Sequence, residues 1–162
     1  MNGVVLQKGE KFYTYLKAVF SSIKNTQINY NWLITDYVCY PQTDSFSKLF
    51  SNIMYYDRYC WLSGEELTAM VEEEDFQWIW AVFSGFDKSV PLEKILKYEL
   101  PYADGYAGFW KNPVTIQHPL ADIEIVPWDS SLTLVISKDC NVVSDFRRAF
   151  PLSEDLAEHN AV

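Results

Sequence analysis

The chain has 162 residues, of which 49% are hydrophobic, and a formal net charge of −9. This length suits one domain, and this composition excludes an intrinsically disordered chain. No apolar run approaches the roughly 20 residues that a membrane-spanning helix needs. Charged side chains at Lys8, Glu10 and Lys11 interrupt the N-terminal segment, so we expect neither a membrane span nor a signal peptide. We predict a single globular domain over residues 1–162 that ends in a short, mobile, acidic tail from about residue 153.

In the first half of the chain, apolar spacing and strand-like composition alternate. They predict a helix over residues 11–24, a strand over 30–40, a helix over 46–54 that Asp44 or Ser45 caps, and a strand over 55–62. Ser63 followed three residues later by Glu66 matches a capping box, in which two backbone N–H groups gain acceptors, so a helix is expected over 64–73. Residues 76–83 are apolar on both faces, which predicts a central strand that is covered on both sides.

The second half of the chain predicts more strand and fewer helical turns. A short helix is expected from Ser89 or Pro91 to about residue 97, followed by a loop over 98–119 that is rich in Pro and Gly. Residues 123–128 and 132–137 indicate a hairpin, with Pro127 favouring an edge or a bulge. A helix from Asp139 or Asn141 to residue 149 and a helical turn from 153 complete the chain. This order predicts an α+β fold, with helices packed against a mixed, mainly antiparallel sheet of about five strands.

The negative charge is concentrated in two segments that contain no basic residue. The first has six acids and the second has three: Glu65, Glu66, Glu72, Glu73, Glu74 and Asp75, then Glu154, Asp155 and Glu158. The rest of the chain balances to zero. Direct nucleic-acid binding is disfavoured because phosphate contacts need clustered Lys and Arg, whereas a basic protein partner is favoured. The alternative interpretation is that these acids form only a solvated helix face.

Aromatic residues are abundant, with 10 Phe, 11 Tyr and 6 Trp. Some of them must build the core, but Tyr and Trp are also enriched at binding hot spots. The loop over 98–119 is unusually aromatic, and four of its side chains are candidates for partner binding: Tyr102, Tyr106, Phe109 and Trp110. The first acidic segment supplies the other candidates, namely Glu65, Glu66, Glu72, Glu73, Glu74 and Asp75.

Motifs that would mark a catalytic site, a phosphate-binding loop or a zinc site do not occur. We therefore expect no catalytic residues, no metal and no cofactor. The three cysteines, Cys39, Cys60 and Cys140, have no CxxC spacing and suit the reducing cytoplasm, where they act as inert hydrophobic side chains. A nucleophilic pair of one cysteine with His118 has no local support. Three carboxylates that lie close in sequence to the aromatic loop are the remaining candidates for enzyme chemistry, namely Asp122, Glu124 and Asp129.

Two runs prompt a resemblance to the immunity proteins of bacterial polymorphic and contact-dependent toxin systems. They are WLSGEEL with its acidic continuation to residue 75, and IEIVPWDSS over residues 123–131. The chain as a whole resembles these small, acidic, cysteine-poor α+β proteins in character. The resemblance implies binding to a cognate toxin domain, often a basic nuclease, by covering its active site. It implies no particular residue.

Three hypotheses follow from these patterns. The first is a non-catalytic inhibitor whose interface combines the acidic helix over 64–75 with the aromatic loop over 98–110, so that acids speed association and aromatic anchors slow dissociation. The second is an orphan enzyme or small-ligand-binding domain that uses the aromatic loop and nearby carboxylates. The third is an adaptor or a homodimer that covers its own aromatic residues. The sequence does not decide the oligomeric state.

Overall fold

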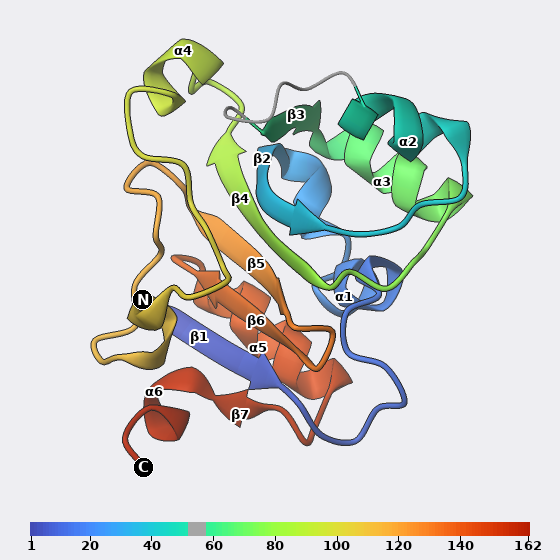
Figure 1. Cartoon of the computed structure of the whole chain (residues 1–162). Helices are drawn as coiled ribbons and strands as arrows, with labels where there is room; N and C mark the ends of the chain where they lie inside the picture. Colours follow the sequence, from blue (N-terminus) through green and yellow to red (C-terminus); the bar gives the residue numbers. More distant parts are fainter. Residues whose placement is uncertain (52–57) are drawn as a thin grey trace.

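The computed structural model describes residues 1–51 and 58–162, and it places a seven-stranded sheet at the centre of the molecule (Figure 1). The strands are β1 (Asn2–Leu6), β2 (Tyr30–Val38), β3 (Tyr59–Ser63), β4 (Trp80–Asp87), β5 (Ile123–Trp128), β6 (Leu132–Ser137) and β7 (Glu154–Asp155). Their order in the sheet is β3-β2-β4-β5-β6-β1-β7. All strand pairs in the described chain are antiparallel. The α+β class is therefore confirmed, with seven strands where about five were expected.

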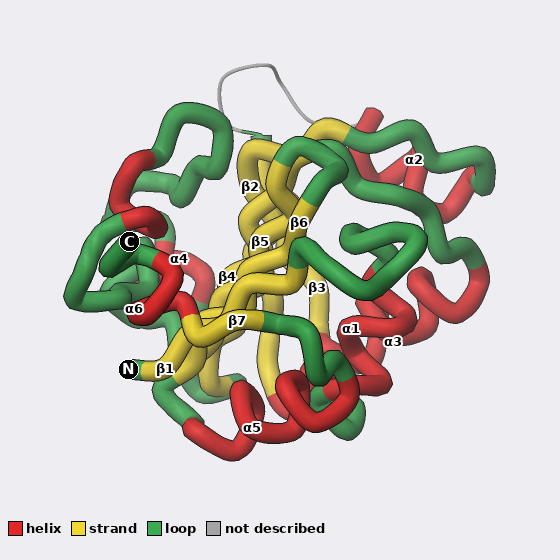
Figure 2. Tube along the Cα trace, turned by 90° about the horizontal axis from the view of Figure 1, so that it is seen from below, coloured by secondary structure: helices red, strands yellow, loops and turns green. Residues whose placement is uncertain are grey.

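The helices are short, and they lie on both sides of the sheet. The α-helices are α1 (Leu16–Ser22), α2 (Asp44–Ser51), α3 (Gly64–Glu73), α4 (Leu92–Ile95), α5 (Cys140–Ala149) and α6 (Leu156–His159). Two 3-10 turns, η1 (Thr26–Asn29) and η2 (Ala107–Trp110), complete the elements. Figure 2 shows the sheet from its edge, with α1 and α3 on one side and α4 and α6 on the other.

Alternation along the strands sends side chains to the two faces of the sheet, where they join separate hydrophobic clusters. Val135 of β6 packs under α1, α3 and α5, whereas its neighbours Leu134 and Ile136 face the opposite side. On that side the irregular segment over 98–122 covers the sheet, and it buries Ala103 and Phe109. The period of two along a strand thus gives the sheet two apolar faces that need cover. One face is covered by helices and the other mainly by a loop.

The two additional strands are β1 and β7. β1 pairs with β6 along five residues, and β7 pairs with Val4 and Val5 of β1. β7 has only two residues, both acidic, so it carries no sequence pattern that could predict a strand. The segment expected to be a mobile tail from about residue 153 forms β7 and α6, with Ser153 and Leu156 buried.

The short helix predicted to about residue 97 is only α4, and the strand predicted over 30–40 ends at Val38 as β2. Two larger differences, at α1 and β4, arise because long-range contacts replace local structure. The helix predicted from residue 11 begins only at Leu16. The Thr14 hydroxyl donates to the Trp78 carbonyl at 2.7 Å, and Tyr15 forms a bridge with Gln77. The strand predicted over 76–83 is correspondingly displaced and becomes β4 over Trp80–Asp87. It lies between β2 and β5, so its internal position is confirmed.

The hairpin of β5 and β6 forms where it was predicted, but β5 is an internal strand. Pro127 was expected to mark an edge or a bulge. It is tolerated inside the sheet because the ladder from β4 to β5 ends at Ile125, two residues earlier. The helix predicted over 46–54 is observed as α2 and the strand predicted over 55–62 as β3, while residues 52–57 lie outside the described part of the chain.

Helix α3 spans Gly64–Glu73, as predicted, and its capping box is present. The Ser63 hydroxyl accepts the Glu66 N–H at 3.1 Å, and the Glu66 carboxylate accepts the Ser63 N–H at 2.8 Å. Ser63→Ala is expected to lower the free energy of unfolding by about 1 kcal/mol, because it removes the acceptor of one N–H at the helix start. Urea denaturation measures this loss, and Ser63→Thr, which keeps the hydroxyl, should retain most of the stability. A loss of similar size in both variants would contradict the cap.

Candidate functional site

The carboxylates of α3, and that of Glu74 directly after it, have partners within the chain. Glu65 pairs with Lys88, and Glu66 completes the capping box. Glu73 accepts from the Ser45 hydroxyl at 3.0 Å. The Glu74 carboxylate accepts the backbone N–H groups of Gln42 and Thr43 at 2.5 and 2.8 Å; desolvation raises its pKa, but these hydrogen bonds outweigh that effect and the pKa is lowered.

These contacts explain why acidic residues occupy the C-terminal end of α3. Their position at the negative end of the helix dipole is locally unfavourable, so the stability of the helix alone does not account for it. In the structure Glu73 and Glu74 attach the segment that leads into α2. Tertiary hydrogen bonds therefore explain their placement.

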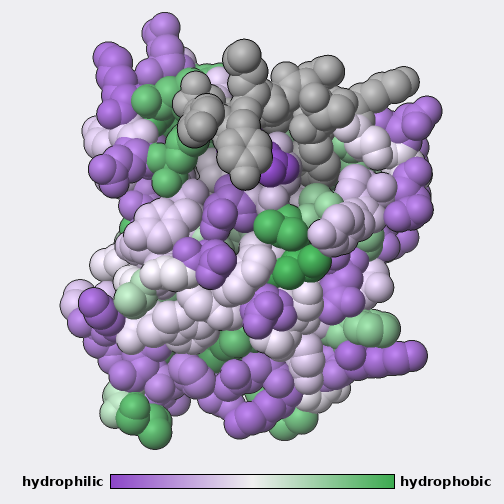
Figure 3. Space-filling model, viewed as in Figure 1, coloured by the Kyte–Doolittle hydropathy of each residue, from purple (hydrophilic) through white to green (hydrophobic). Residues whose placement is uncertain are grey.

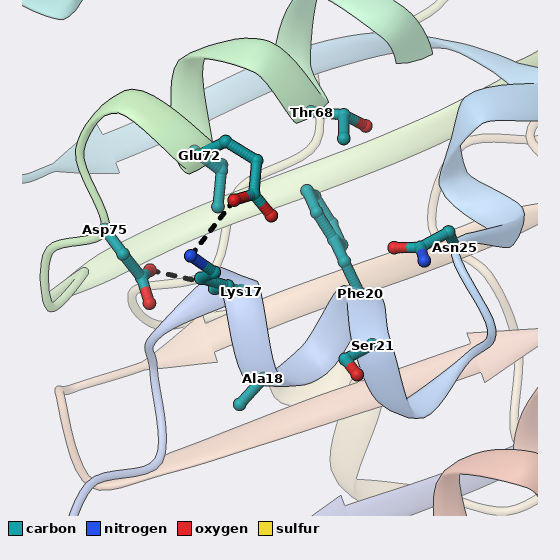
Figure 4. Close-up of a pocket in the computed structure, with 9 residues that line it drawn as sticks. Lys17, Ala18, Phe20, Ser21, Asn25, Thr68, Glu72 and Asp75 are labelled. Atoms are coloured by element: carbon teal, nitrogen blue, oxygen red, sulfur yellow. Dashed lines mark hydrogen bonds and ion pairs between the residues drawn. The ribbon is translucent and has the colours of Figure 1, made fainter.

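A groove of about 430 Å³ lies between α1 and α3, and we call it the helical groove (Figure 4). At one end Lys17 pairs with Glu72 at 3.0 Å, and its backbone N–H donates to Asp75 at 3.3 Å. Burial raises the pKa of the half-buried Asp75, partly offset by Lys17. Thr68 and Asn25 line the opposite end, with Phe20 between the ends (Figure 4). Lys17 thus partly neutralises the negative charge of Glu72 and Asp75 in the groove.

The aromatic candidates differ widely in exposure. Phe109 is buried at 1% exposed, and Tyr106 and Trp110 are half-buried, whereas Tyr102 is 47% exposed. Trp110 packs edge-on against Trp128, with ring centroids 5.1 Å apart. Phe109 and Trp110 therefore pack over the sheet, and Phe109 has almost no accessible surface. Tyr98, which lay outside the predicted site set, is 42% exposed.

The two halves of the predicted interface lie on opposite sides of the sheet. Leu67 and Val71 of α3 belong to the core under the helices, whereas Ala103 and Phe109 of the loop belong to the core on the other face. Figure 2 shows the sheet between these layers. A single flat interface cannot use both the acidic helix and the aromatic loop. The prediction was wrong in this respect because sequence spacing does not reveal which face an element covers.

The irregular segment over 98–122, which includes the aromatic loop, is held to the sheet by a buried carboxylate. Glu124 of β5 is fully buried and accepts the N–H groups of Gln117 and His118 at 2.8 and 3.0 Å, and the Ser84 hydroxyl at 3.2 Å. Burial raises the pKa of Glu124 to about 7, against the lowering effect of these donors. Gln117 in turn pairs with both backbone groups of Tyr102, at 2.8 and 2.9 Å. The exposed tyrosine is thus held by a chain of hydrogen bonds that begins in the core.

Two further contacts fix the same segment. Asp36 adopts a left-handed backbone conformation (φ 47°) at an irregularity in β2, and its carboxylate accepts the N–H groups of Ala103 and Asp104 at 2.8 and 3.0 Å. The buried His118 ring accepts the Leu120 N–H through Nδ1 and lies 3.1 Å from the Ile95 carbonyl through Nε2. Burial lowers the pKa of His118, which favours the neutral ring. Neither Asp36 nor Gln117 was predicted, because their importance arises from contacts that are distant in sequence.

The carboxylates considered for enzyme chemistry do not converge on an open cleft. Glu124 is inaccessible and its oxygens are occupied, Asp122 pairs with Lys138 at 3.0 Å, and Asp129 is exposed in the hairpin turn. Burial raises the pKa of the Cys39 and Cys60 thiols to about 12, so both are neutral near pH 7. Within residues 1–51 and 58–162, no group of three His, Cys, Asp or Glu side chains could hold a metal ion.

A second cavity, of about 340 Å³, lies on the loop-covered side. Its lining is formed by Tyr98, Glu99, Leu100, Tyr102, Tyr106, Gln117 and Pro119, and we call it the tyrosine cavity. Leu100 and Tyr102 also line a further cavity of about 320 Å³, together with Arg58 and residues of β2. In the space-filling view, hydrophobic side chains are scattered among hydrophilic ones (Figure 3). Of the residues that line the tyrosine cavity, Tyr98 and Tyr102 are large and exposed, at 42% and 47%.

Comparison of the chain with protein-family models, with curated proteins and with solved structures found no match. Among the helices of the described chain, none is both long and apolar enough to cross a bilayer. The fold and the side-chain geometry are therefore the basis for a functional proposal.

Proposed function

We propose that the protein is a non-catalytic protein-binding module, and that it acts as an immunity protein which neutralises a cognate, basic toxin domain. The observation that carries the binding proposal is the display of Tyr98 and Tyr102 on a firmly held backbone. Tyrosine provides a large contact area with few rotatable bonds. A backbone that is already ordered loses little further entropy when a partner binds.

The proposed binding surface is the loop-covered side, centred on Tyr98 and Tyr102. The acids of α3 support the basic character of the partner only through the net charge of −9, since their carboxylates contact residues of the same chain. Long-range attraction between opposite net charges raises association rates without direct contacts. The interface predicted from the sequence combined the acidic helix with the aromatic loop. The surface proposed here differs from it because it lies on only one face of the sheet.

An enzyme remains the less favoured alternative. A general acid or base must come within hydrogen-bond reach of a substrate. Glu124 has a suitably raised pKa, but it is fully buried beneath the loop and accepts three hydrogen bonds. We therefore interpret it as an anchor of the binding loop.

The test uses a photo-crosslinking amino acid at position 102, introduced into the protein in its native host. The partner that is captured from position 102, and not from position 12, is then purified. Phe12 serves as the control because it is exposed to the same extent, 47%, and precedes α1. An equimolar amount of this protein should abolish the activity of the partner. If the purified partner binds but keeps its activity, the immunity function is wrong while the binding function stands.

Replacing both tyrosines, as Tyr98→Ala with Tyr102→Ala, is expected to increase the dissociation rate of that partner about 30-fold or more, the effect of losing a hot spot of about 2 kcal/mol. The association rate should change little, because no charge is removed. Surface plasmon resonance measures both rates. Phe12→Ala is the matched control, and unchanged dissociation of the double variant would contradict the proposed surface.

A further inference from the structure

The tyrosine cavity combines aromatic rings with one carboxylate. Tyr98 and Tyr102 are exposed, and Tyr106 packs edge-on against Tyr102, with ring centroids 5.2 Å apart. Glu99 lies between the two exposed tyrosines in sequence and lines the same cavity. At about 340 Å³, the cavity is at the lower end of the range for small-ligand sites, so it suits one side chain or one small molecule.

No cation of the described chain occupies these rings. The cation–ring contacts in residues 1–51 and 58–162 are Lys11 over Phe12 and Arg58 over Tyr37. Over the same residues, Glu99 takes part in neither an ion pair nor a side-chain hydrogen bond. This distinguishes Glu99 from the carboxylates of α3, each of which has a partner. The negative faces of the rings and the Glu99 carboxylate thus attract positive charge from outside the chain.

The geometry of the cavity is fixed before any ligand arrives. Gln117 lines the cavity and pairs with both backbone groups of Tyr102, while its own N–H is held by the buried Glu124. On the other side His118 contacts the Tyr98 ring edge-on, with centroids 5.3 Å apart. Both walls are therefore supported from the core, and ordering them for a ligand costs little entropy.

We propose that the tyrosine cavity binds a cationic group, an alkylammonium or a guanidinium, presented by a basic side chain of the protein partner. This inference rests on the proposed function and names the group that the partner inserts. A cation over aromatic faces is attracted by the ring quadrupoles, and the attraction increases when the cation is partly desolvated. Glu99 adds direct charge complementarity, in keeping with the net charge of −9.

The experiment is an NMR titration of the intact protein that follows the tyrosine ring signals. The probes are n-butylammonium and n-propylguanidinium, which copy lysine and arginine, with n-butanol as the neutral control. Choline and its uncharged isostere 3,3-dimethylbutanol represent a free quaternary ammonium. We expect saturable shifts at Tyr98, Tyr102 and Tyr106 with the butylammonium and propylguanidinium probes, at millimolar affinity. Equal shifts with n-butanol, or none with either basic probe, would overturn the inference. Selective binding of choline alone would overturn a partner side chain as the source.

Variants separate the contributions of the rings and of the carboxylate. Tyr102→Leu and Glu99→Gln should each weaken butylammonium binding about threefold, a typical size for one exposed cation–ring or charge contact. Tyr102→Phe keeps the ring and should bind nearly as well. Glu93→Gln is the matched control, since Glu93 is an exposed acid on α4 outside the cavity. Unchanged binding of the ammonium probe by Tyr102→Leu and Glu99→Gln, in folded samples, contradicts the site.

The same variants distinguish failure of this inference from failure of the proposed function. If Tyr98→Ala with Tyr102→Ala weakens the purified partner but Glu99→Gln does not, the tyrosines form the interface and the cation is wrong. If neither change affects partner binding, the proposed surface itself is wrong. If both weaken it, and a lysine or arginine of the partner is required, the inference is supported.

Discussion

Gly64→Ala is expected to lower the free energy of unfolding by about 3 kcal/mol or more, although alanine is the better helix former. A Cβ atom at this position would lie 2.2 Å from the Gln27 carbonyl oxygen and 2.7 Å from the Ile28 Cα. These atoms belong to the backbone of η1, so they cannot move aside as a flexible side chain would. The same Gln27 carbonyl accepts the indole N–H of the buried Trp32 at 2.9 Å. Displacing it therefore disturbs the core, and overpacking outweighs the gain of roughly 1 kcal/mol in helix propensity.

Urea denaturation of Gly64→Ala and of Glu65→Ala provides the comparison. Glu65 is the next residue of α3, and its pair with Lys88 is exposed and screened by water, so Glu65→Ala should change stability little. A large loss in Gly64→Ala alone identifies the close approach of η1 as the cause. Stabilisation of Gly64→Ala would show that η1 can shift and that helix propensity decides the outcome.

Glu124→Gln is expected to change the pH dependence of stability more than any other carboxylate variant. The pKa of Glu124 rises from the ordinary 4.5 to about 7 in the folded protein. The folded state therefore binds more protons than the unfolded state between these values. The stability that this group contributes is present below pH 4.5 and is lost, by about 3 kcal/mol, as the pH rises through 7. Glutamine does not titrate, so the stability advantage of the unmodified protein over Glu124→Gln should fall by most of this amount between pH 5 and 8.

Urea denaturation at several pH values measures this difference. His118 titrates in the opposite sense, since its pKa is lowered, but it is present in both proteins and its effect cancels. Asp122→Asn is the control, because this carboxylate lies two residues from Glu124, is 38% exposed and pairs with Lys138. A difference between Glu124→Gln and the unmodified protein that stays constant with pH would show that Glu124 is ionised throughout this range.

Local patterns predicted the elements whose stabilising contacts are close in sequence. The capping box placed the start of α3 because both of its hydrogen bonds join residues three positions apart. The hairpin of β5 and β6 followed from two β-rich runs around a short turn. The short edge strand β7 could not be predicted in this way, since only its pairing with Val4 and Val5 makes it a strand.

The candidate site was predicted only in part. Tyr102 was identified from the density of aromatic residues, and the structure exposes it. Phe109 and Trp110 carried the same signal, yet they pack against the sheet. Composition cannot separate a covering aromatic residue from an exposed one, because both roles use large apolar side chains. Glu99 and Gln117 gave no signal, since their surroundings depend on contacts that are distant in sequence.

The sequence by itself determined the α+β class, the internal position of the strand that became β4, and the start and end of α3. Periodicity and capping are local properties, so neighbouring residues suffice to specify them. Only the tertiary structure decided that the acids of α3 contact Lys17, Lys88 and the segment before α2, and that the aromatic loop covers the opposite face of the sheet. Charge and aromaticity are properties of single residues, whereas their availability to a partner depends on which groups the folded chain brings against them.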